Sequence, residues 1–175
     1  MNGSNEKPSD RLGIDPQRAA RMRILVVDDD SQLVDFLRQL FEDLKFRVIT
    51  AFTGDEALGA VHDHEDIDIA FIDYRLPGID GLETIRKILA VSPDTICIVI
   101  TGLPTLDSSI RAIRLGASDY LLKPFNLEDI MTAVRKAMKE REIKLEIRKL
   151  REKAESFKGD SRTRARIDIN DNIGK

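Results

Sequence analysis

The sequence predicts an α/β fold in which a doubly wound parallel sheet carries an extended C-terminal helix. From Arg23 onward, a short apolar run followed by an amphipathic stretch recurs five times. The apolar runs are nearly continuous, which is typical of strands that are buried on both faces of a parallel sheet. Because crossovers between parallel strands are right-handed, the intervening helices are expected on both faces of one sheet.

Each repeat pairs one strand with one helix. The first strand is expected at 24–27, and the helix after it shows apolar residues at helical spacing from Leu33 to Leu44. The later pairs are expected at 47–51 and 55–61, 67–72 and 82–89, 95–100 and 106–113, and 120–122 followed by a helix from Leu127.

The last helix is expected to extend beyond the sheet. Residues from Leu127 to about Phe157 include neither glycine nor proline. The predicted organisation is a flexible N-terminal arm at 1–21, a domain at 22–140, a helical extension at 141–158 and a disordered tail at 159–175. The extension spaces apolar residues by alternating steps of four and three, which favours a coiled coil over a solvated helix. These residues are Ile143, Ile147, Leu150, Ala154 and Phe157.

Composition indicates a soluble surface of mixed charge. Hydrophobic residues make up 42% of the chain and charged residues 34%, yet the net charge is only -3. This balance favours neither nucleic acid nor a membrane as a partner, and no apolar run approaches the roughly 20 residues that span a bilayer. We therefore expect a cytoplasmic protein. The single cysteine, Cys97, lies in an apolar run and is expected in the core.

Polar residues follow the predicted strands at the points where ligands bind in such sheets. Asp28, Asp29 and Asp30 follow the first strand, Asp73 the third and Thr101 the fourth. The fifth is followed by Lys123 and Pro124. Because clustered carboxylates oppose each other's ionisation, we expect a cation among them, and oxygen ligands suit Mg²⁺ or Mn²⁺.

A carboxylate in such surroundings can act as the nucleophile in phosphoryl transfer. Asp73 stands singly and is the expected nucleophile, Asp28 and Asp29 form a pair suited to the metal, and Asp30 or Ser31 is expected to cap the following helix. The alternative is that all of these aspartates only cap helices.

The motifs together resemble the receiver domain of two-component response regulators over about 22–140. The matching segments are Ile24-Leu25-Val26-Val27-Asp28-Asp29-Asp30, Asp73-Tyr74-Arg75-Leu76-Pro77-Gly78-Ile79-Asp80-Gly81, Ile98-Val99-Ile100-Thr101-Gly102 and Tyr120-Leu121-Leu122-Lys123-Pro124-Phe125. The resemblance implies a flavodoxin-like (βα)5 sheet with strand order 2-1-3-4-5 and a cis peptide before Pro124.

By this resemblance, Asp73 accepts a phosphoryl group from a histidine kinase or phosphotransfer protein. Asp28 and Asp29 are then the metal-binding pair, with the backbone carbonyl of Arg75 as a further ligand. Lys123 contacts the phosphoryl group, and Thr101 and Tyr120 are the switch residues. The domain is not a conventional enzyme, although it catalyses its own phosphorylation and dephosphorylation.

The resemblance does not determine how the domain passes its signal to a downstream partner. A homodimer is conceivable through the face formed by the fourth helix, fifth strand and fifth helix, or through the C-terminal helix, and direct nucleic acid binding is not expected. Two alternatives remain: a degenerate receiver that binds partners without phosphorylation, and a phosphatase of the haloacid dehalogenase type. The second alternative leaves Asp73 unexplained and has Gln32 where that family has threonine or valine.

Overall fold

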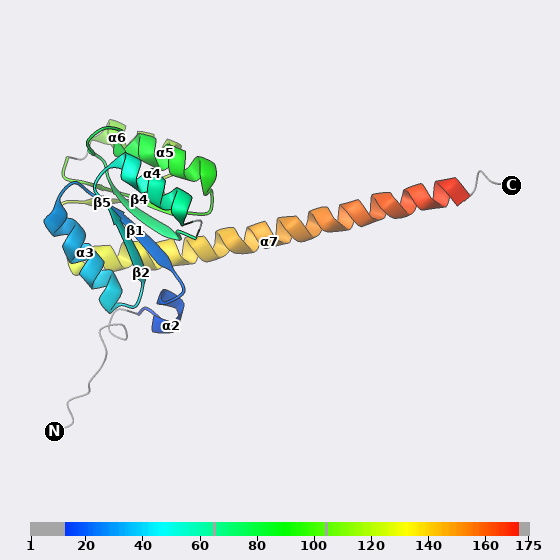
Figure 1. The fold of residues 1–175 in the computed structure, drawn as a ribbon, viewed down its shortest axis with the longest axis horizontal. Helices are drawn as coiled ribbons and strands as arrows, with labels where there is room; N and C mark the ends of the chain where they lie inside the picture. The colour runs from blue at the N-terminus through cyan, green and yellow to red at the C-terminus, as the bar shows by residue number, and fades with distance from the viewer. Residues whose placement is uncertain (1–12, 65, 104, 172–175) are drawn as a thin grey trace, which may run out of the picture. The chain divides into compact units, whose positions relative to one another are not determined.

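The sheet and its helices follow the predicted order. The computed structural model describes residues 13–64, 66–103 and 105–171, with side chains up to 155. Figure 1 labels its elements. The strands are β1 (Arg23–Val27), β2 (Arg47–Ala51), β3 (Ile69–Asp73), β4 (Ile96–Thr101) and β5 (Asp119–Leu122). The helices are α2 (Pro16–Ala19), α3 (Ser31–Asp43), α4 (Gly54–Asp63), α5 (Gly81–Val91), α6 (Leu106–Arg114) and α7 (Leu127–Asp171).

All strand pairs are parallel, and the sheet order β2-β1-β3-β4-β5 confirms the predicted flavodoxin-like topology. Winding reverses between β1 and β3, which are neighbours in the sheet although β2 separates them in sequence. The carboxyl ends of β1 and β3 therefore lie side by side, at the position where ligands bind in sheets of this kind.

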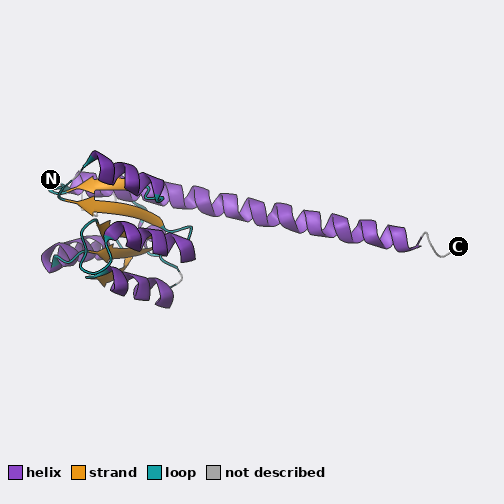
Figure 2. Ribbon diagram, turned by 90° about the horizontal axis from the view of Figure 1, so that it is seen from above, coloured by secondary structure: helices purple, strands orange, loops and turns teal. Residues whose placement is uncertain are grey.

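Alternate strand residues supply two separate cores. Ile24 and Val26 of β1 face a cluster formed with α3 and the first turns of α7, whereas Leu25 and Val27 face a cluster formed with α4, α5 and α6. Figure 2 shows the strands lying between helices. Cys97 is fully buried in the second cluster, as predicted. Both faces of the sheet are thus covered, which explains the continuous apolar runs.

The prediction of a flexible N-terminal arm at 1–21 is wrong for the last residues of that segment. Asp15 caps the short helix α2, and Ile14 and Ala19 are buried in the cluster that contains α7. The guanidinium of Arg18 donates to the backbone carbonyl of Met138 at 2.9 Å. Contacts with distant residues therefore order a segment whose own sequence shows no periodicity. Residues 1–12 lie outside the described part of the chain.

The C-terminal helix is longer than expected. The helix α7 continues through Gly159 and ends at Asp171, so the prediction of a disordered tail from 159 is wrong up to that residue. A glycine inside a helix costs about 1 kcal/mol relative to alanine, which weakens a helix without ending it. The chain divides into two compact units after Arg141, one residue beyond the predicted end of the domain.

Half-buried ion pairs hold the last residue of the first unit. The side chain of Arg141 is 12% exposed and donates to Asp68 at 3.0 Å, and it lies 3.7 Å from Asp94. Asp68 also accepts from the backbone amide of Arg23 at the start of β1. The helix α7 is therefore fastened to the amino ends of the strands, opposite the end that carries the predicted site.

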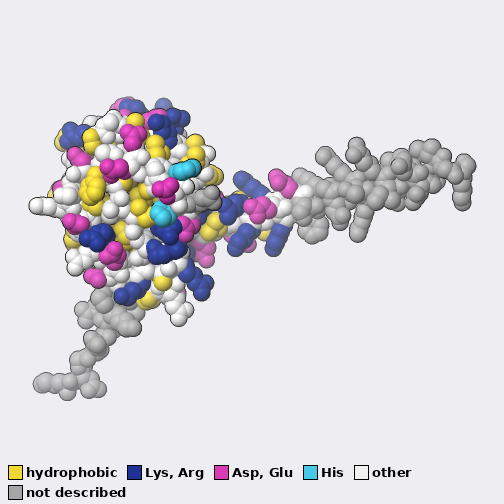
Figure 3. Space-filling view, in the orientation of Figure 1, with side chains coloured by type: hydrophobic (Ala, Val, Ile, Leu, Met, Phe, Trp, Pro, Cys, Tyr) yellow, Lys and Arg dark blue, Asp and Glu magenta, His cyan; other side chains and the backbone are white. Residues whose placement is uncertain are grey.

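Charges of both signs are interspersed on the described surface shown in Figure 3, in agreement with the composition. Within the described residues, no helix is both long and apolar enough to cross a membrane.

Candidate phosphoacceptor site

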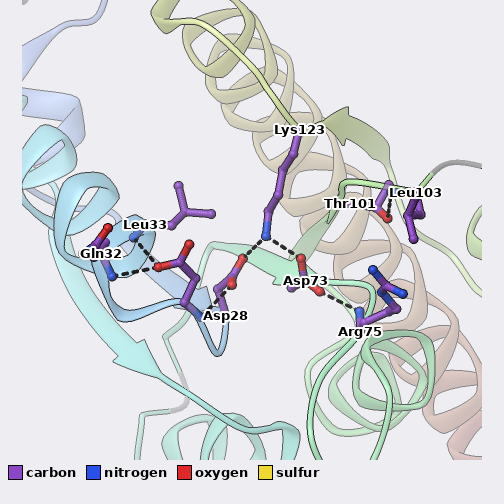
Figure 4. A network of polar contacts seen from close by, with 9 residues as sticks. Asp28, Gln32, Leu33, Asp73, Arg75, Thr101, Leu103 and Lys123 are labelled. Carbon is purple, nitrogen blue, oxygen red and sulfur yellow. Dashed lines mark hydrogen bonds and ion pairs between the residues drawn. The ribbon is translucent and has the colours of Figure 1, made fainter.

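Lys123 joins two of the predicted carboxylates. Its ammonium nitrogen lies 2.6 Å from Asp28 Oδ2 and 2.7 Å from Asp73 Oδ1, so it bridges the ends of β1 and β3 (Figure 4). The Asp28 side chain is 1% exposed, the Asp73 side chain 9% and the Lys123 side chain 27%. The parallel sheet thus brings together three residues that lie far apart in the sequence.

Backbone amides fix the orientation of both carboxylates. The amide of Asp30 donates to Asp28 Oδ1 at 3.0 Å, and the amide of Arg75 donates to Asp73 Oδ2 at 2.6 Å. A carboxylate has about four lone-pair positions, and these contacts together with Lys123 occupy one on each oxygen. Each carboxylate therefore retains acceptor capacity for a metal ion or an electrophile.

The turn after β3 brings its backbone against Asp73. Asp80 caps α5, and the first residue of that helix, Gly81, packs directly on the backbone of Asp73. A Cβ atom added at Gly81 would lie 2.0 Å from the Asp73 carbonyl oxygen, so no larger residue fits there. This contact explains why a glycine ends the Asp73 motif. The earlier sequence interpretation gave Gly81 no role.

Burial and mutual hydrogen bonds shift the pKa values of Asp28 and Lys123. Burial raises the pKa of Asp28, although hydrogen bonds from Lys123 and the Asp30 amide oppose this effect. Burial lowers the pKa of Lys123, but its hydrogen bonds to Asp28 and Asp73 outweigh burial and the net shift is upward. Lys123 therefore keeps its ammonium, and this one positive charge faces two buried carboxylates, which leaves one negative charge of the cluster uncompensated.

The donor set fits a divalent cation. Within the described residues, no group of three or more histidine, cysteine, aspartate or glutamate side chains converges as a metal cluster. Magnesium is commonly held by only one or two carboxylates, with water and phosphate oxygens completing its shell. Asp28 and Asp73 provide two such carboxylates, and Asp29 is exposed beside them. Asp30 instead caps α3 by accepting from the amides of Gln32 and Leu33, as predicted.

The two predicted switch residues have hydrogen-bond partners outside the charged cluster. The Thr101 hydroxyl is buried and accepts from the amide of Leu103 at 3.2 Å. The Tyr120 ring is half-buried, and its hydroxyl lies 3.1 Å from Ser108 Oγ on α6. The sequence interpretation missed Ser108. Its signal was the spacing Thr105-x-x-Ser108, because a hydroxyl residue three positions before a second polar residue is a helix-capping pattern.

The peptide bond between Lys123 and Pro124 is cis, as the resemblance implied.

Comparison with known proteins identifies the class. The response regulator receiver domain family matches residues 24–135. The regulatory protein DctD of Rhizobium meliloti, named for C4-dicarboxylate transport and transcription, is 34% identical over 138 residues. The alignment covers 79% of this chain but 30% of DctD. The chain belongs to the receiver domain family of two-component response regulators, and phosphorylation-based switching is typical of that family.

Solved structures give the same fold. A CheY-like receiver domain protein from Methanospirillum hungatei is 32% identical with a TM-score of 0.66, and the match covers 70% of this chain and 98% of that protein. The DrrB receiver domain, solved in a BeF3-activated form, is 31% identical with a TM-score of 0.61 over 67% of this chain and 97% of that domain. These matches leave the haloacid dehalogenase alternative without support.

Proposed function

We propose that Asp73 accepts a phosphoryl group and that Lys123 and a divalent cation assist the transfer. The observation that carries this proposal is the Lys123 ammonium, which lies 2.7 Å from Asp73 Oδ1 and also contacts the buried Asp28. A lone ammonium between two carboxylates leaves negative charge where a phosphoryl group would arrive. A site of this kind needs added positive charge before an anion can approach.

The reaction forms a carboxyl phosphate. An oxygen of Asp73 attacks the phosphorus of a phosphohistidine, the phosphorus–nitrogen bond breaks, and the leaving imidazole takes up a proton. Lys123 then contacts a phosphoryl oxygen as a compact positive donor. Asp28, Asp29, Asp73 and the carbonyl of Arg75 would hold Mg²⁺ or Mn²⁺, which supplies positive charge that offsets the charge on the phosphoryl oxygens. Attack by water on the phosphorus later releases inorganic phosphate and restores the Asp73 carboxylate.

Phosphorylation would be read out by the switch residues. The Thr101 hydroxyl exchanges its bond to the Leu103 amide for one to the phosphoryl group, and the Tyr120 ring, which packs beneath α6 in this structure, occupies that position for more of the time. The differential contact between the two states is the phosphoryl oxygen itself, as a population shift requires.

Acetyl phosphate tests the proposal directly. The purified chain is incubated with acetyl phosphate and Mg²⁺, and its intact mass is followed with and without a chelator. A phosphate-sized gain is expected for the parent and for Asp80→Asn, because asparagine also caps helices well. Asp73→Asn is expected to gain nothing. Two results for the parent would together favour a degenerate receiver: no gain in mass at any time point, and no binding of beryllofluoride.

The signalling partner belongs to the same proposal. We infer a histidine kinase or phosphotransfer protein as the donor, acting in the cytoplasm. The chain covers less than a third of DctD, so the activity that DctD's name describes belongs to that whole protein. The expectation that residues 1–175 do not bind nucleic acid stays a prediction.

The helical extension is proposed to pair with a second copy. Ile143 is 50% exposed, Ile147 43% and Leu150 56%, so the predicted seam is open in a single chain. Ala154 continues the seam, and the side chain of Phe157 lies outside the described residues. Sedimentation of the parent, Ile147→Asp and Lys149→Asp tests the pairing. A dimer that is lost only in Ile147→Asp supports it, and a monomeric parent at all concentrations contradicts it.

A further inference from the structure

The hydroxyl of Ser108 occupies an unusual position between the start of α6 and Tyr120. Ser108 is 3% exposed and forms a reciprocal capping box with Thr105, in which each side chain accepts from the other's backbone amide at 3.0 and 3.1 Å. The same Ser108 Oγ lies 3.1 Å from the Tyr120 hydroxyl. One oxygen thus caps a helix and contacts a side chain of the neighbouring strand β5.

Ser108 Oγ has more partners than it can satisfy at once. It contacts the Thr105 amide, the Thr105 hydroxyl at 3.0 Å, the Thr105 carbonyl at 2.9 Å and the Tyr120 hydroxyl. A serine hydroxyl offers one donor and two acceptor positions. Three of the four contacts therefore satisfy it completely. The Tyr120 and Thr105 hydroxyls therefore alternate at one acceptor position of Ser108 Oγ, and when Tyr120 leaves, the Thr105 hydroxyl takes that position, so Ser108 Oγ is never without a partner.

We propose that Ser108 is a positioning residue that holds the Tyr120 ring under α6 through a hydrogen bond that breaks and re-forms without loss of the helix cap. The Tyr120 ring packs against the cluster shared by α4, α5 and α6. This is the placement that we assign to the phosphorylated state, so the inference rests on the proposed function. The bond between Ser108 and Tyr120 therefore favours the state that binds the phosphoryl group.

The bond also connects Tyr120 to an exposed apolar face. Leu106 is 79% exposed, Ile110 40% and Ile113 72%, and all three lie on α6 at spacings of four and three residues. Ser108 lies on the buried side of the same helix. Movement of the Tyr120 ring is thus transmitted to the first turn of the helix that presents these side chains.

Beryllofluoride, which mimics a phosphoryl group, measures the effect. Its midpoint of binding with Mg²⁺ is determined for the parent, Ser108→Ala, Tyr120→Phe and the double variant. Each single substitution is expected to weaken binding about fivefold, the equivalent of one hydrogen bond. Because both remove the same bond, the double variant is expected to remain about fivefold weaker rather than 25-fold. Additive losses, or unchanged binding by Ser108→Ala, would overturn the proposal.

Ser109→Ala is the matched control. Ser109 is half-buried and donates to the same Thr105 carbonyl at 3.1 Å, whereas the Tyr120 hydroxyl contacts Ser108, so loss of the Ser109 hydroxyl is expected to leave binding unchanged. Tyr120→Phe complements Ser108→Ala because it leaves the capping box intact.

A spectroscopic measurement tests this inference independently of the proposed function. The chain has no tryptophan and two tyrosines, so Tyr74→Phe leaves Tyr120 as the only tyrosine whose near-ultraviolet band is observed. In that background, Ser108→Ala is expected to shift the Tyr120 band without any phosphoryl analogue, whereas Ser109→Ala does not. An unshifted band refutes the Ser108 bond. A shifted band in a chain that binds no beryllofluoride supports the bond while removing the proposed phosphoacceptor function.

Discussion

The charge balance around Lys123 gives a quantitative prediction. Its ammonium lies 2.6 Å from Asp28 and 2.7 Å from Asp73, and each attraction has a gross value of about 6 kcal/mol at an effective dielectric constant of about 20. Desolvation of the ammonium offsets much of this gain. Lys123→Met removes the cation and leaves two buried carboxylates facing each other, so we expect a loss of about 3–5 kcal/mol in the free energy of unfolding.

Asp28→Asn should change the free energy of unfolding in the opposite direction. It leaves one ammonium and one carboxylate, a balanced pair, and we expect the metal-free domain to gain about 1 kcal/mol. The assay is equilibrium urea unfolding followed by far-ultraviolet circular dichroism, with and without excess Mg²⁺. Added Mg²⁺ should stabilise the parent because it binds only the folded site. It should stabilise Asp28→Asn less, since that variant has lost a metal-binding carboxylate.

The control for this experiment is Lys136→Met. Lys136 also pairs with an aspartate, Asp119 at 3.2 Å, but its side chain is 66% exposed. Exposed pairs contribute about 0–1 kcal/mol, so only a small loss is expected. The reasoning is refuted if Lys123→Met unfolds at the same urea concentration as the parent, or if Asp28→Asn is less stable than the parent without Mg²⁺.

Three further predictions concern packing, the end of the first unit and pH. Gly81→Ala should lower the free energy of unfolding by about 3 kcal/mol or more and impair phosphorylation, because its Cβ would overlap the Asp73 carbonyl. Gly59 lies in the middle of α4, and a Cβ added there meets nothing within 4 Å. Gly59→Ala should therefore raise the free energy of unfolding in urea by about 0.5–1 kcal/mol. Arg141→Met should cost about 2 kcal/mol because it removes an ion-pair partner from the half-buried Asp68 carboxylate. Arg86→Met, from an exposed pair, should match the parent in a thermal melt. Because burial raises the pKa of Asp28, the metal-free domain should gain stability as the pH falls through that raised pKa, with the gain complete below the unfolded value of 3.8. Mg²⁺ affinity should fall over the same range as protons compete for the carboxylate, and a pH series of Mg²⁺ titrations that shows no such fall would contradict this assignment.

Local patterns predicted the sheet because its strands are short apolar runs between clear helix signals. Strand order followed from the resemblance, and the charged cluster followed from the fact that parallel strands end at one edge. Asp28, Asp73 and Lys123 meet as expected, and Asp30 caps α3. The roles of Asp29 and Arg75 as metal ligands stay predictions.

Contacts between distant residues account for what the sequence did not predict. Ile14 and Ala19 are buried in a cluster that includes residues of α3 and α7, and a four-residue helix is too short for its periodicity to predict this burial. The pairing of Arg141 with Asp68 also joins residues that no motif connects. Gly159 marked the expected end of the last helix, but α7 continues to Asp171, because a single glycine inside a helix costs only about 1 kcal/mol relative to alanine.

The short helix α2 has a practical consequence for experiments on isolated domains. The family match covers 24–135, so a chain cut to those limits loses Ile14 and Ala19 from the core and also ends before Arg141. Such a fragment would expose the underside of α7 to solvent. Its backbone amides between Ile130 and Val134, in the part of α7 that the fragment retains, would then exchange hydrogen faster than those of the full chain. Measurements of phosphoryl lifetime on that fragment would therefore describe a looser molecule than the one that contains residues 13–141.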